Sequence, residues 1–155
     1  MFVKVFLVCS ITFISLSLFG QENVSNYPIK INSAPDYPIG EHISFWKDIG
    51  NSAPEEALRK FQQGSFSPLA HPTLFNKGYT ESIWWFAFRI ENELDSKNTV
   101  IFSPAGAAIR EGTLYTFDNN GKLIETAYSG FIHAGQSRDM HSRLNSYELI
   151  LPAGE

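Results

Sequence analysis

The clearest hydrophobic pattern in the chain lies between residues 82 and 92, where large apolar side chains recur at alternate positions. One set of alternate positions carries four of them: Trp84, Phe86, Phe88 and Ile90. The other set carries Trp85, Ala87, Arg89 and Glu91. A two-residue repeat is typical of a β-strand with one buried face, so we predict a single strand with the first set in the core. The second set is then expected on the exposed face.

Shorter alternating runs predict further strands at residues 29–31, 42–48, 99–104, 113–118, 122–128 and 147–151. Between two of these runs lies Asn119-Asn120-Gly121, which tolerates the backbone of a tight turn and predicts a hairpin. Strands at this spacing, with short turns, favour an all-β fold in the form of an antiparallel β-sandwich. The run at residues 147–151 comes last, so we expect it to lack a partner and to leave an exposed edge.

The spacing of apolar residues changes from every second position to a helical spacing between residues 51 and 66. This pattern predicts one short α-helix near residues 53–63. Ser52 to Glu55 resembles a capping box, Pro54 suits the first turn, and Gly64 is a suitable end. An apolar stripe at helical spacing is formed by Ala57, Leu58 and Phe61. We expect this stripe to contact the core rather than to form a groove for a partner.

The N-terminal twenty residues differ in character from the rest of the chain. Lys4 precedes an apolar run over residues 5–19, and Gly20 ends this run. This is the form of a secretory signal peptide over residues 1–20, with an uncleaved membrane anchor as the alternative. Removal of this segment also removes Cys9, the only cysteine. We therefore predict an exported protein without disulfide or thiol chemistry.

The length of the chain limits the number of domains, and its charge limits the kind of partner. A chain of 155 residues fits one domain, which we place at residues 41–155 after an extended, proline-containing lead-in at residues 21–40. There are 12 Lys and Arg residues against 16 Asp and Glu, giving a net charge of −4, and no basic patch stands out. Nucleic acid is therefore not an expected partner.

Motifs for catalysis are absent from the sequence. It contains no Gly-x-Ser-x-Gly, no phosphate-binding glycine loop and no His-Glu-x-x-His, and its carboxylates lack the paired spacing of a glycosidase. We predict that the chain is not an enzyme. His133, Asp139 and His141 could contribute to a metal site, but a solvated loop with incidental histidines is the favoured interpretation. No metal and no cofactor are predicted.

Aromatic side chains are candidates for binding a small ligand. The apolar C–H face of a sugar suits a flat ring, and Trp85, Tyr115 and Trp46 are the best candidates for such stacking. Arg89 accompanies Trp85 on the second face of the predicted strand, where a guanidinium beside an aromatic ring can stack on a ligand or on that ring. The alternative for each aromatic residue is a place in the core.

Two further arginines flank the loop that contains the histidines. Arg138 and Arg143 could clamp a carboxylate or a phosphate, or could pair with Glu125 or Glu148. The predicted ligand-binding set is therefore Trp85, Arg89, Tyr115, Arg138 and Arg143.

Several segments together resemble one protein family. They are residues 43–48, Pro54, Glu55, Glu56, Leu58, Phe66, residues 76–78, Trp84, Trp85, Asn92, Leu114, Tyr115, Gly130, Arg138, Arg143 and residues 147–154. Over about residues 40–155 the chain resembles the type 2 extracellular domain of bacterial seven-transmembrane receptors with diverse intracellular signalling modules. The resemblance implies a periplasmic sensor with a jelly-roll fold that binds carbohydrate-like or other small ligands. It also implies membrane and signalling modules in a longer gene product, so we expect residues 41–155 to be C-terminally incomplete.

Different classes of function remain open from the sequence. The first is a sensor whose aromatic and arginine side chains capture a small polar ligand such as a carbohydrate. The second is a structural module that relays the state of a neighbouring domain or forms a homodimer. An accessory domain of an exported carbohydrate-active enzyme is a third.

Overall fold

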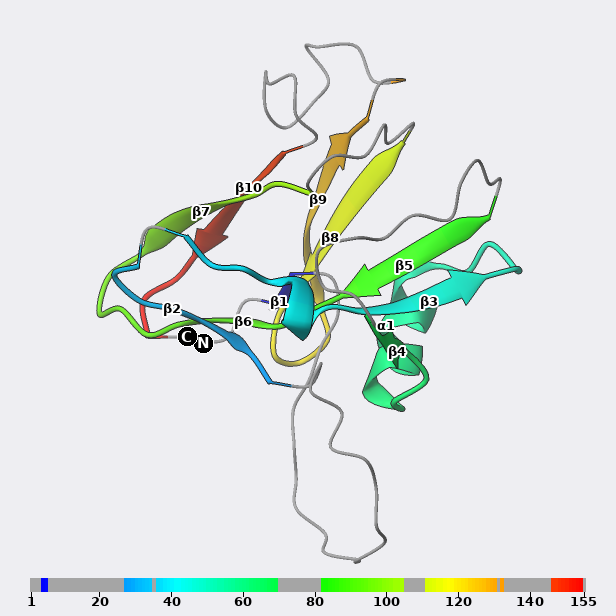
Figure 1. Ribbon diagram of the computed structural model, residues 1–155, viewed down its shortest axis with the longest axis horizontal. Coiled ribbons are helices and arrows are strands. Elements are labelled where there is room, and N and C mark those ends of the chain that lie inside the picture. Colours follow the sequence, from blue (N-terminus) through cyan, green and yellow to red (C-terminus); the bar gives the residue numbers. More distant parts are fainter. Residues whose placement is uncertain are drawn as a thin grey trace, which may run out of the picture.

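The computed structural model describes residues 4–5, 27–34, 36–69, 82–104, 111–130, 132 and 146–154. In this part the protein is mostly β, with one short α-helix, as the sequence predicts (Figure 1). The strands are β1 Lys4–Val5, β2 Ile29–Ile31, β3 Ser44–Asp48, β4 Ser67–Pro68, β5 Ile83–Ala87, β6 Ile90–Asn92, β7 Asn98–Phe102, β8 Gly112–Phe117, β9 Leu123–Ser129 and β10 Tyr147–Leu151. They form four small sheets, in the orders β4–β3–β5, β1–β8–β9, β7–β10 and β2–β6.

The pairing of β2 with β6 is parallel, so the prediction of an antiparallel fold is wrong for this sheet. Ile29 and Ile31 of β2 are both buried, and burial of an isoleucine contributes about 1.5–3 kcal/mol, which draws this segment against β6. On its exposed side Lys30 forms an ion pair with Glu93 at 2.5 Å. The other strand pairs are antiparallel.

The segment predicted as one strand over residues 82–92 is two strands in two sheets. β5 pairs with β3 and ends at Ala87, whereas β6 begins at Ile90 and pairs with β2. Ala87 and Phe88 are consecutive and both buried, so the alternation changes phase between the strands. Phe88 and Ile90 are in the core as predicted. A continuous two-residue repeat cannot describe a segment that turns between sheets.

The predicted helix is α1, Pro54–Gln62, and its apolar stripe is buried as expected. The predicted capping box is wrong, because the residue before the helix is Ala53 and no side chain caps this end. The hydroxyl of Ser52 donates instead to Asp48, at 3.2 Å. At the other end Gly64 has a φ of +72°, a conformation that glycine adopts without strain, and it ends the helix as predicted.

The predicted hairpin is confirmed as β8 and β9, with Leu114 opposite Ala127. Its turn is held by Asp118, whose Oδ1 accepts hydrogen bonds from the backbone N–H groups of Asn120 (2.8 Å) and Lys122 (2.9 Å). Gly121 has a φ of +81°, as such a turn requires. The short strand β1 pairs with the other edge of β8.

The last strand, β10, pairs with β7 along its whole length, so the prediction that it lacks a partner is wrong. Beside this pair, the buried amide of Asn92 joins the end of β6 to the end of β10. Its Nδ2 donates to the carbonyl oxygens of Pro152 (2.6 Å) and Ser96 (2.9 Å), and its Oδ1 accepts from the backbone of Leu94 (3.1 Å). The N–H of Gly154 donates to the carbonyl of Leu94 at 2.8 Å. We call this group the Asn92 clamp.

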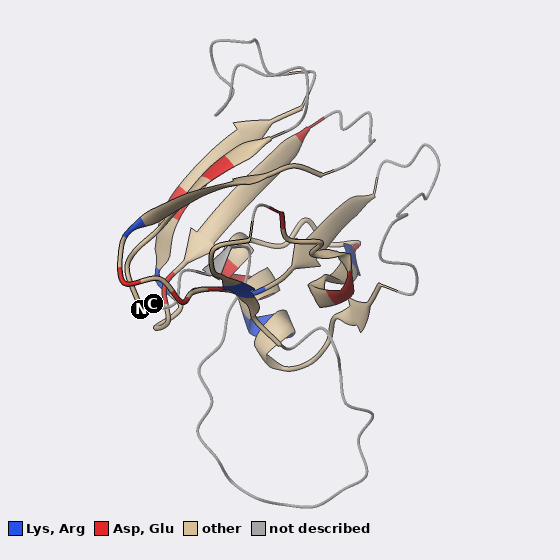
Figure 2. Cartoon of the chain, turned by 60° about the vertical axis from the view of Figure 1, so that its left-hand side comes forward, with Lys and Arg blue, Asp and Glu red and all other residues tan. Residues whose placement is uncertain are grey.

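One hydrophobic cluster connects these elements. Its buried members come from β2, α1, β5, β6, β8, β9 and β10 and from the segments that follow α1 and β5: Ile29, Ile31, Ala57, Leu58, Phe61, Phe66, Trp85, Ala87, Phe88, Ile90, Leu114, Phe117, Ala127, Tyr147, Leu149 and Leu151. Charged residues are scattered over the described elements (Figure 2). Among the described residues Asp48 is the one charged residue that is buried.

Candidate functional site

The pairing of β3 with β5, within the three-stranded sheet β4–β3–β5, creates a surface with two different faces. In this register Phe45 lies opposite Phe86 and Lys47 lies opposite Trp84. Directly opposite residues share a face of the sheet. We call this face the outer face, defined by Phe45, Lys47, Trp84 and Phe86. The inner face carries Ser44, Trp46, Asp48, Ile83, Trp85 and Ala87.

The inner face belongs to the core except at the start of β5, where Ile83 is exposed. Only 6% of Trp85 is exposed, and its indole Nε1 donates to Asp48 Oδ2 at 3.0 Å. The ring of Trp85 lies 5.9 Å from that of Tyr115 on β8, centroid to centroid. Because both its nitrogen and its ring have partners within the protein, Trp85 links β5, β3 and β8.

Asp48 is a buried carboxylate with several donors. Its oxygens accept hydrogen bonds from the backbone N–H groups of Gly50 (2.8 Å) and Ser52 (2.6 Å) as well as from Trp85. Burial acts to raise the pKa of Asp48, but the hydrogen bonds from Gly50, Trp85 and Ser52 outweigh it and hold the pKa below its ordinary value. Asp48 is therefore ionised at neutral pH and fixes the loop that leads into α1.

Helix α1 covers another part of the inner face. Phe61 packs edge-on against Phe66 at 5.5 Å, and Phe66 lies 6.0 Å from Trp46 on β3. The ammonium of Lys60 lies 4.8 Å from the centroid of the Trp46 ring, within the range of a cation–π interaction. Trp46, predicted as a candidate for stacking on a sugar, is thus engaged by the helix.

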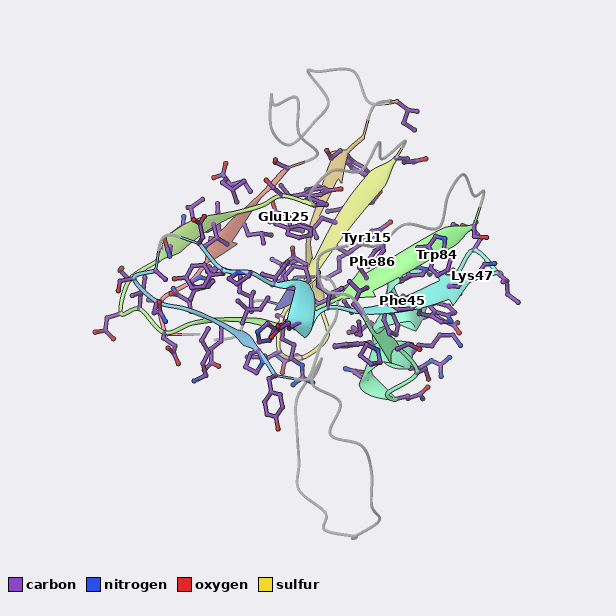
Figure 3. The ribbon with its side chains drawn as sticks, in the orientation of Figure 1. Phe45, Lys47, Trp84, Phe86, Tyr115 and Glu125 are labelled. Atoms are coloured by element: carbon purple, nitrogen blue, oxygen red, sulfur yellow. The ribbon has the colours of Figure 1, made fainter. Side chains whose placement is uncertain are left out.

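The outer face combines three half-buried aromatic rings with one exposed cation. The centroids of Phe45 and Trp84 are 5.9 Å apart, and Lys47 Nζ is 5.8 Å from the centroid of Trp84. In Figure 3 the labels of Phe45, Lys47, Trp84 and Phe86 follow the β3–β5 pair. Lys47 belongs to none of the ion pairs found among the described residues. Phe45 and Lys47 therefore both lie against the Trp84 ring.

The predicted ligand-binding residues lie in different surroundings. The predicted exposure of Trp85 is wrong, because β5 turns this side of the strand toward the core. Arg89 is half-buried between β5 and β6, and its Cζ lies 5.9 Å from the ring centroid of Phe61. Tyr115 is half-buried and contacts Trp85. The structure thus brings Trp85 and Tyr115 together.

Burial, and to a smaller extent the neighbouring Tyr128, raise the pKa of Tyr115, so its hydroxyl stays protonated at neutral pH. Arg138 and Arg143 lie outside the described residues, as do His133, Asp139 and His141. Ligand binding by the five predicted residues remains a prediction.

The sequence interpretation missed the outer face, because it assigned Trp84 and Phe86 to the core. One signal was present. Lys47 shares a face with Phe45 in the run at residues 42–48, and a lysine rarely occupies a buried position. The pairing partner of this run was needed to extend the same inference to β5.

Within the described part of the chain, no group of three or more His, Cys, Asp or Glu residues could hold a metal ion. Among the same residues, no helix has the length and apolar character needed to cross a membrane.

The segments that carry the family resemblance meet in space. Asp48 and Trp85 join two of them by a hydrogen bond, and Asn92 joins another to Pro152. Comparison with curated proteins and with solved structures gave no match. Comparison with family models matched residues 40–155 to the 7TMR-DISM extracellular 2 family. The chain therefore belongs to this family of extracellular domains from seven-transmembrane receptors with diverse intracellular signalling modules.

Proposed function

We propose that this domain is the periplasmic, ligand-sensing input of its receptor, and that it binds a small polar ligand with a carbohydrate-like ring. The observation that carries the proposal is the outer face of β3–β5, where Phe45, Trp84 and Phe86 are only half-buried. Flat aromatic rings at a surface suit the apolar face of a sugar, and neighbouring polar groups then orient it.

The inner face supports this assignment, because it holds the same two strands in place. A binding site needs side chains whose positions are fixed by a second layer of contacts. Trp85 and Asp48 provide such a layer. They follow Trp84 and Lys47 in the chain, lie on the opposite face of the same two strands, and are joined by a hydrogen bond. Ligand would therefore meet an organised surface.

The other parts of the proposal rest on the sequence. We infer that residues 1–20 direct export and that residues 41–155 form the sensor domain. A jelly-roll sandwich is the arrangement we propose for its sheets. Arg89, Tyr115, Arg138 and Arg143 are further candidates for ligand contact, and Trp85 is a candidate to support the site from within. Membrane and signalling modules are expected in the longer gene product.

The test is a binding screen with neutral sugars, sugar acids and amino acids. A ligand at one hundred times its Kd stabilises the native state by about 2.7 kcal/mol, which raises the midpoint of thermal unfolding by several degrees. Trp84→Ala should weaken binding about tenfold or more, as truncation of a central tryptophan does in interfaces. Tyr27→Ala is the matched control, because Tyr27 is an exposed aromatic residue outside the outer face.

The screen has two decisive results. A ligand that binds the parent protein and Tyr27→Ala equally, and Trp84→Ala weakly, supports the proposal. Saturable binding that Trp84→Ala leaves unchanged contradicts the site, and a protein that binds no compound of the panel contradicts the sensing function as stated.

A second candidate function is dimerisation, and the β7–β10 pair favours it. Ile101 and Ile150 are 49% and 45% exposed, and the register places both on one face of this pair, with Thr99 and Glu148. Exposed isoleucines on a sheet face can contact a second copy. Sedimentation equilibrium tests this: a concentration-dependent dimer that Ile150→Lys converts to monomer supports it, and a parent protein that stays monomeric contradicts it.

A further inference from the structure

The turn between β8 and β9 contains Asn120 followed by Gly121, two residues that can react with each other. The backbone nitrogen of the residue after an asparagine can attack the asparagine side chain, and glycine has no Cβ to obstruct this attack. Asn120 is exposed and Gly121 is half-buried. The turn therefore holds the reactants of a deamidation next to each other.

This reaction needs water as its only other reactant. The nitrogen of Gly121 forms a bond with Asn120 Cγ, the bond from Cγ to Nδ2 breaks, and Nδ2 leaves as ammonia with the proton of the Gly121 N–H. Water then opens the resulting succinimide ring at one of its two carbonyl groups. One product is aspartate, and the other is isoaspartate, whose main chain is longer by one carbon.

In the folded protein the attacking nitrogen has a hydrogen-bond acceptor. The N–H of Gly121 donates to the main-chain carbonyl of Asp118 at 3.0 Å. Asp118 Oδ1 accepts hydrogen bonds from the N–H groups on either side, those of Asn120 and Lys122. These hydrogen bonds, and that of Lys122 most strongly, hold the pKa of Asp118 below its ordinary value, so this carboxylate is ionised at neutral pH. A negative charge in the turn disfavours loss of the Gly121 amide proton, which the attack requires.

The position of Gly121 is also fixed by its surroundings. Its φ is +81°, and a Cβ added to it would lie 3.4 Å from Leu58 Cδ2 on α1. The backbone of the turn therefore packs close to the helix. The additional main-chain carbon of an isoaspartate at position 120 would displace Gly121 from this place and from the carbonyl of Asp118.

We propose that Asn120-Gly121 is a deamidation site that the folded turn protects, and that Asp118 provides this protection. The reaction then proceeds when the turn opens or before it has formed. Modified chains accumulate with the time that the chain spends unfolded, so the site keeps a chemical record of unfolding. This inference is independent of the proposed ligand-binding function.

The experiment measures deamidation of the purified protein at mildly alkaline pH, with and without guanidinium chloride. Peptide mapping by mass spectrometry locates the modified residue by its change in mass. We expect Asn120 to react at least about tenfold faster in the denaturant, because the folded protein reacts only after local opening. Asn119 is the internal control and should react slowly in both conditions, since the residue after it carries a side chain. Equal rates at Asn120 would overturn the protection, and an unmodified Asn120 in the denaturant would overturn the site.

Variants test the role of Asp118. Asp118→Ala should raise the rate in the folded protein toward the rate in denaturant, and Asp118→Asn, which keeps an acceptor oxygen without the charge, should give an intermediate rate. Asp95→Ala, in the exposed loop after β6, is the matched control and should react as the parent does. Circular dichroism shows which variants are folded. A folded Asp118→Asn or Asp118→Ala that reacts no faster than the parent overturns the role of Asp118.

The effect of the product on the turn is tested with the isoaspartate form, separated by chromatography. Its midpoint of thermal unfolding should lie below that of Asn120→Asp, which carries the same charge on an unchanged main chain. Equal midpoints would overturn the inferred displacement of Gly121.

Discussion

The two faces of the β3–β5 pair are made of neighbouring residues, yet they serve different purposes. On the inner face Trp85 is buried, donates to Asp48 and contacts Tyr115. On the outer face Trp84 is half-buried, next to Phe45 and the exposed Lys47. The same side-chain type is therefore fully buried in the core at one position and half-buried beside an exposed cation at the next. The difference teaches that an aromatic residue here must be interpreted by its face, not by its type.

The largest test of this comparison exchanges each tryptophan for alanine. Trp85→Ala removes a buried ring and leaves Asp48 without one donor, so we expect the free energy of unfolding to fall by about 3–5 kcal/mol. Trp84→Ala should lower it by less than half as much, because this ring is already partly exposed. Denaturation in urea, followed by circular dichroism, measures both. Equal losses would contradict the distinction between the faces.

A smaller effect is expected from Asp48→Asn, which changes the charge and keeps the shape. The new amide has only one acceptor oxygen, and its NH₂ group then meets an N–H donor of Trp85, Gly50 or Ser52. A buried donor left without an acceptor costs about 1–3 kcal/mol, and the same denaturation experiment measures this loss. Asp95→Asn, in the exposed loop after β6, is the control and should change stability by less than about 0.5 kcal/mol. A parent-like stability of Asp48→Asn would show that Asp48 is dispensable.

The smallest effect is the pH dependence that Asp48 contributes. Its pKa is lowered in the folded state, so its contribution is complete above the ordinary pKa of about 4 and is lost as the pH falls through the folded value. Asp118 has a lowered pKa too, but it is present in both proteins and cancels in the comparison. Unfolding midpoints measured between pH 7 and pH 2 should therefore fall more steeply for the parent than for Asp48→Asn. Parallel curves would contradict this role.

The sequence predicted the local elements well because their signals are local. The turn at residues 119–121, the apolar stripe of α1 and the alternation of β10 each depend on residues close together in the chain. The family was also predicted correctly, from a spaced set of residues that spans the domain.

The sequence could not predict which face of each strand lies toward the core. Alternation shows which residues share a side, but the choice of the inner side depends on the pairing partner. Ser44 and Asp48 are polar and nevertheless lie on the inner face, because Asp48 finds donors there. The pairing of β2 with β6 joins segments about sixty residues apart, and no local signal specifies it.

The Asn92 clamp has a consequence for the order of folding. Asn92 and Pro152 are 60 positions apart, so their hydrogen bond cannot form until the end of β10 has emerged during synthesis or export. The β3–α1–β5 segment ends at Ala87 and can pack long before that moment. Contacts between distant residues form late because a long loop must close first. The strands of the surface proposed for the ligand can therefore pair before β10 is available, whereas the clamp can form only afterwards.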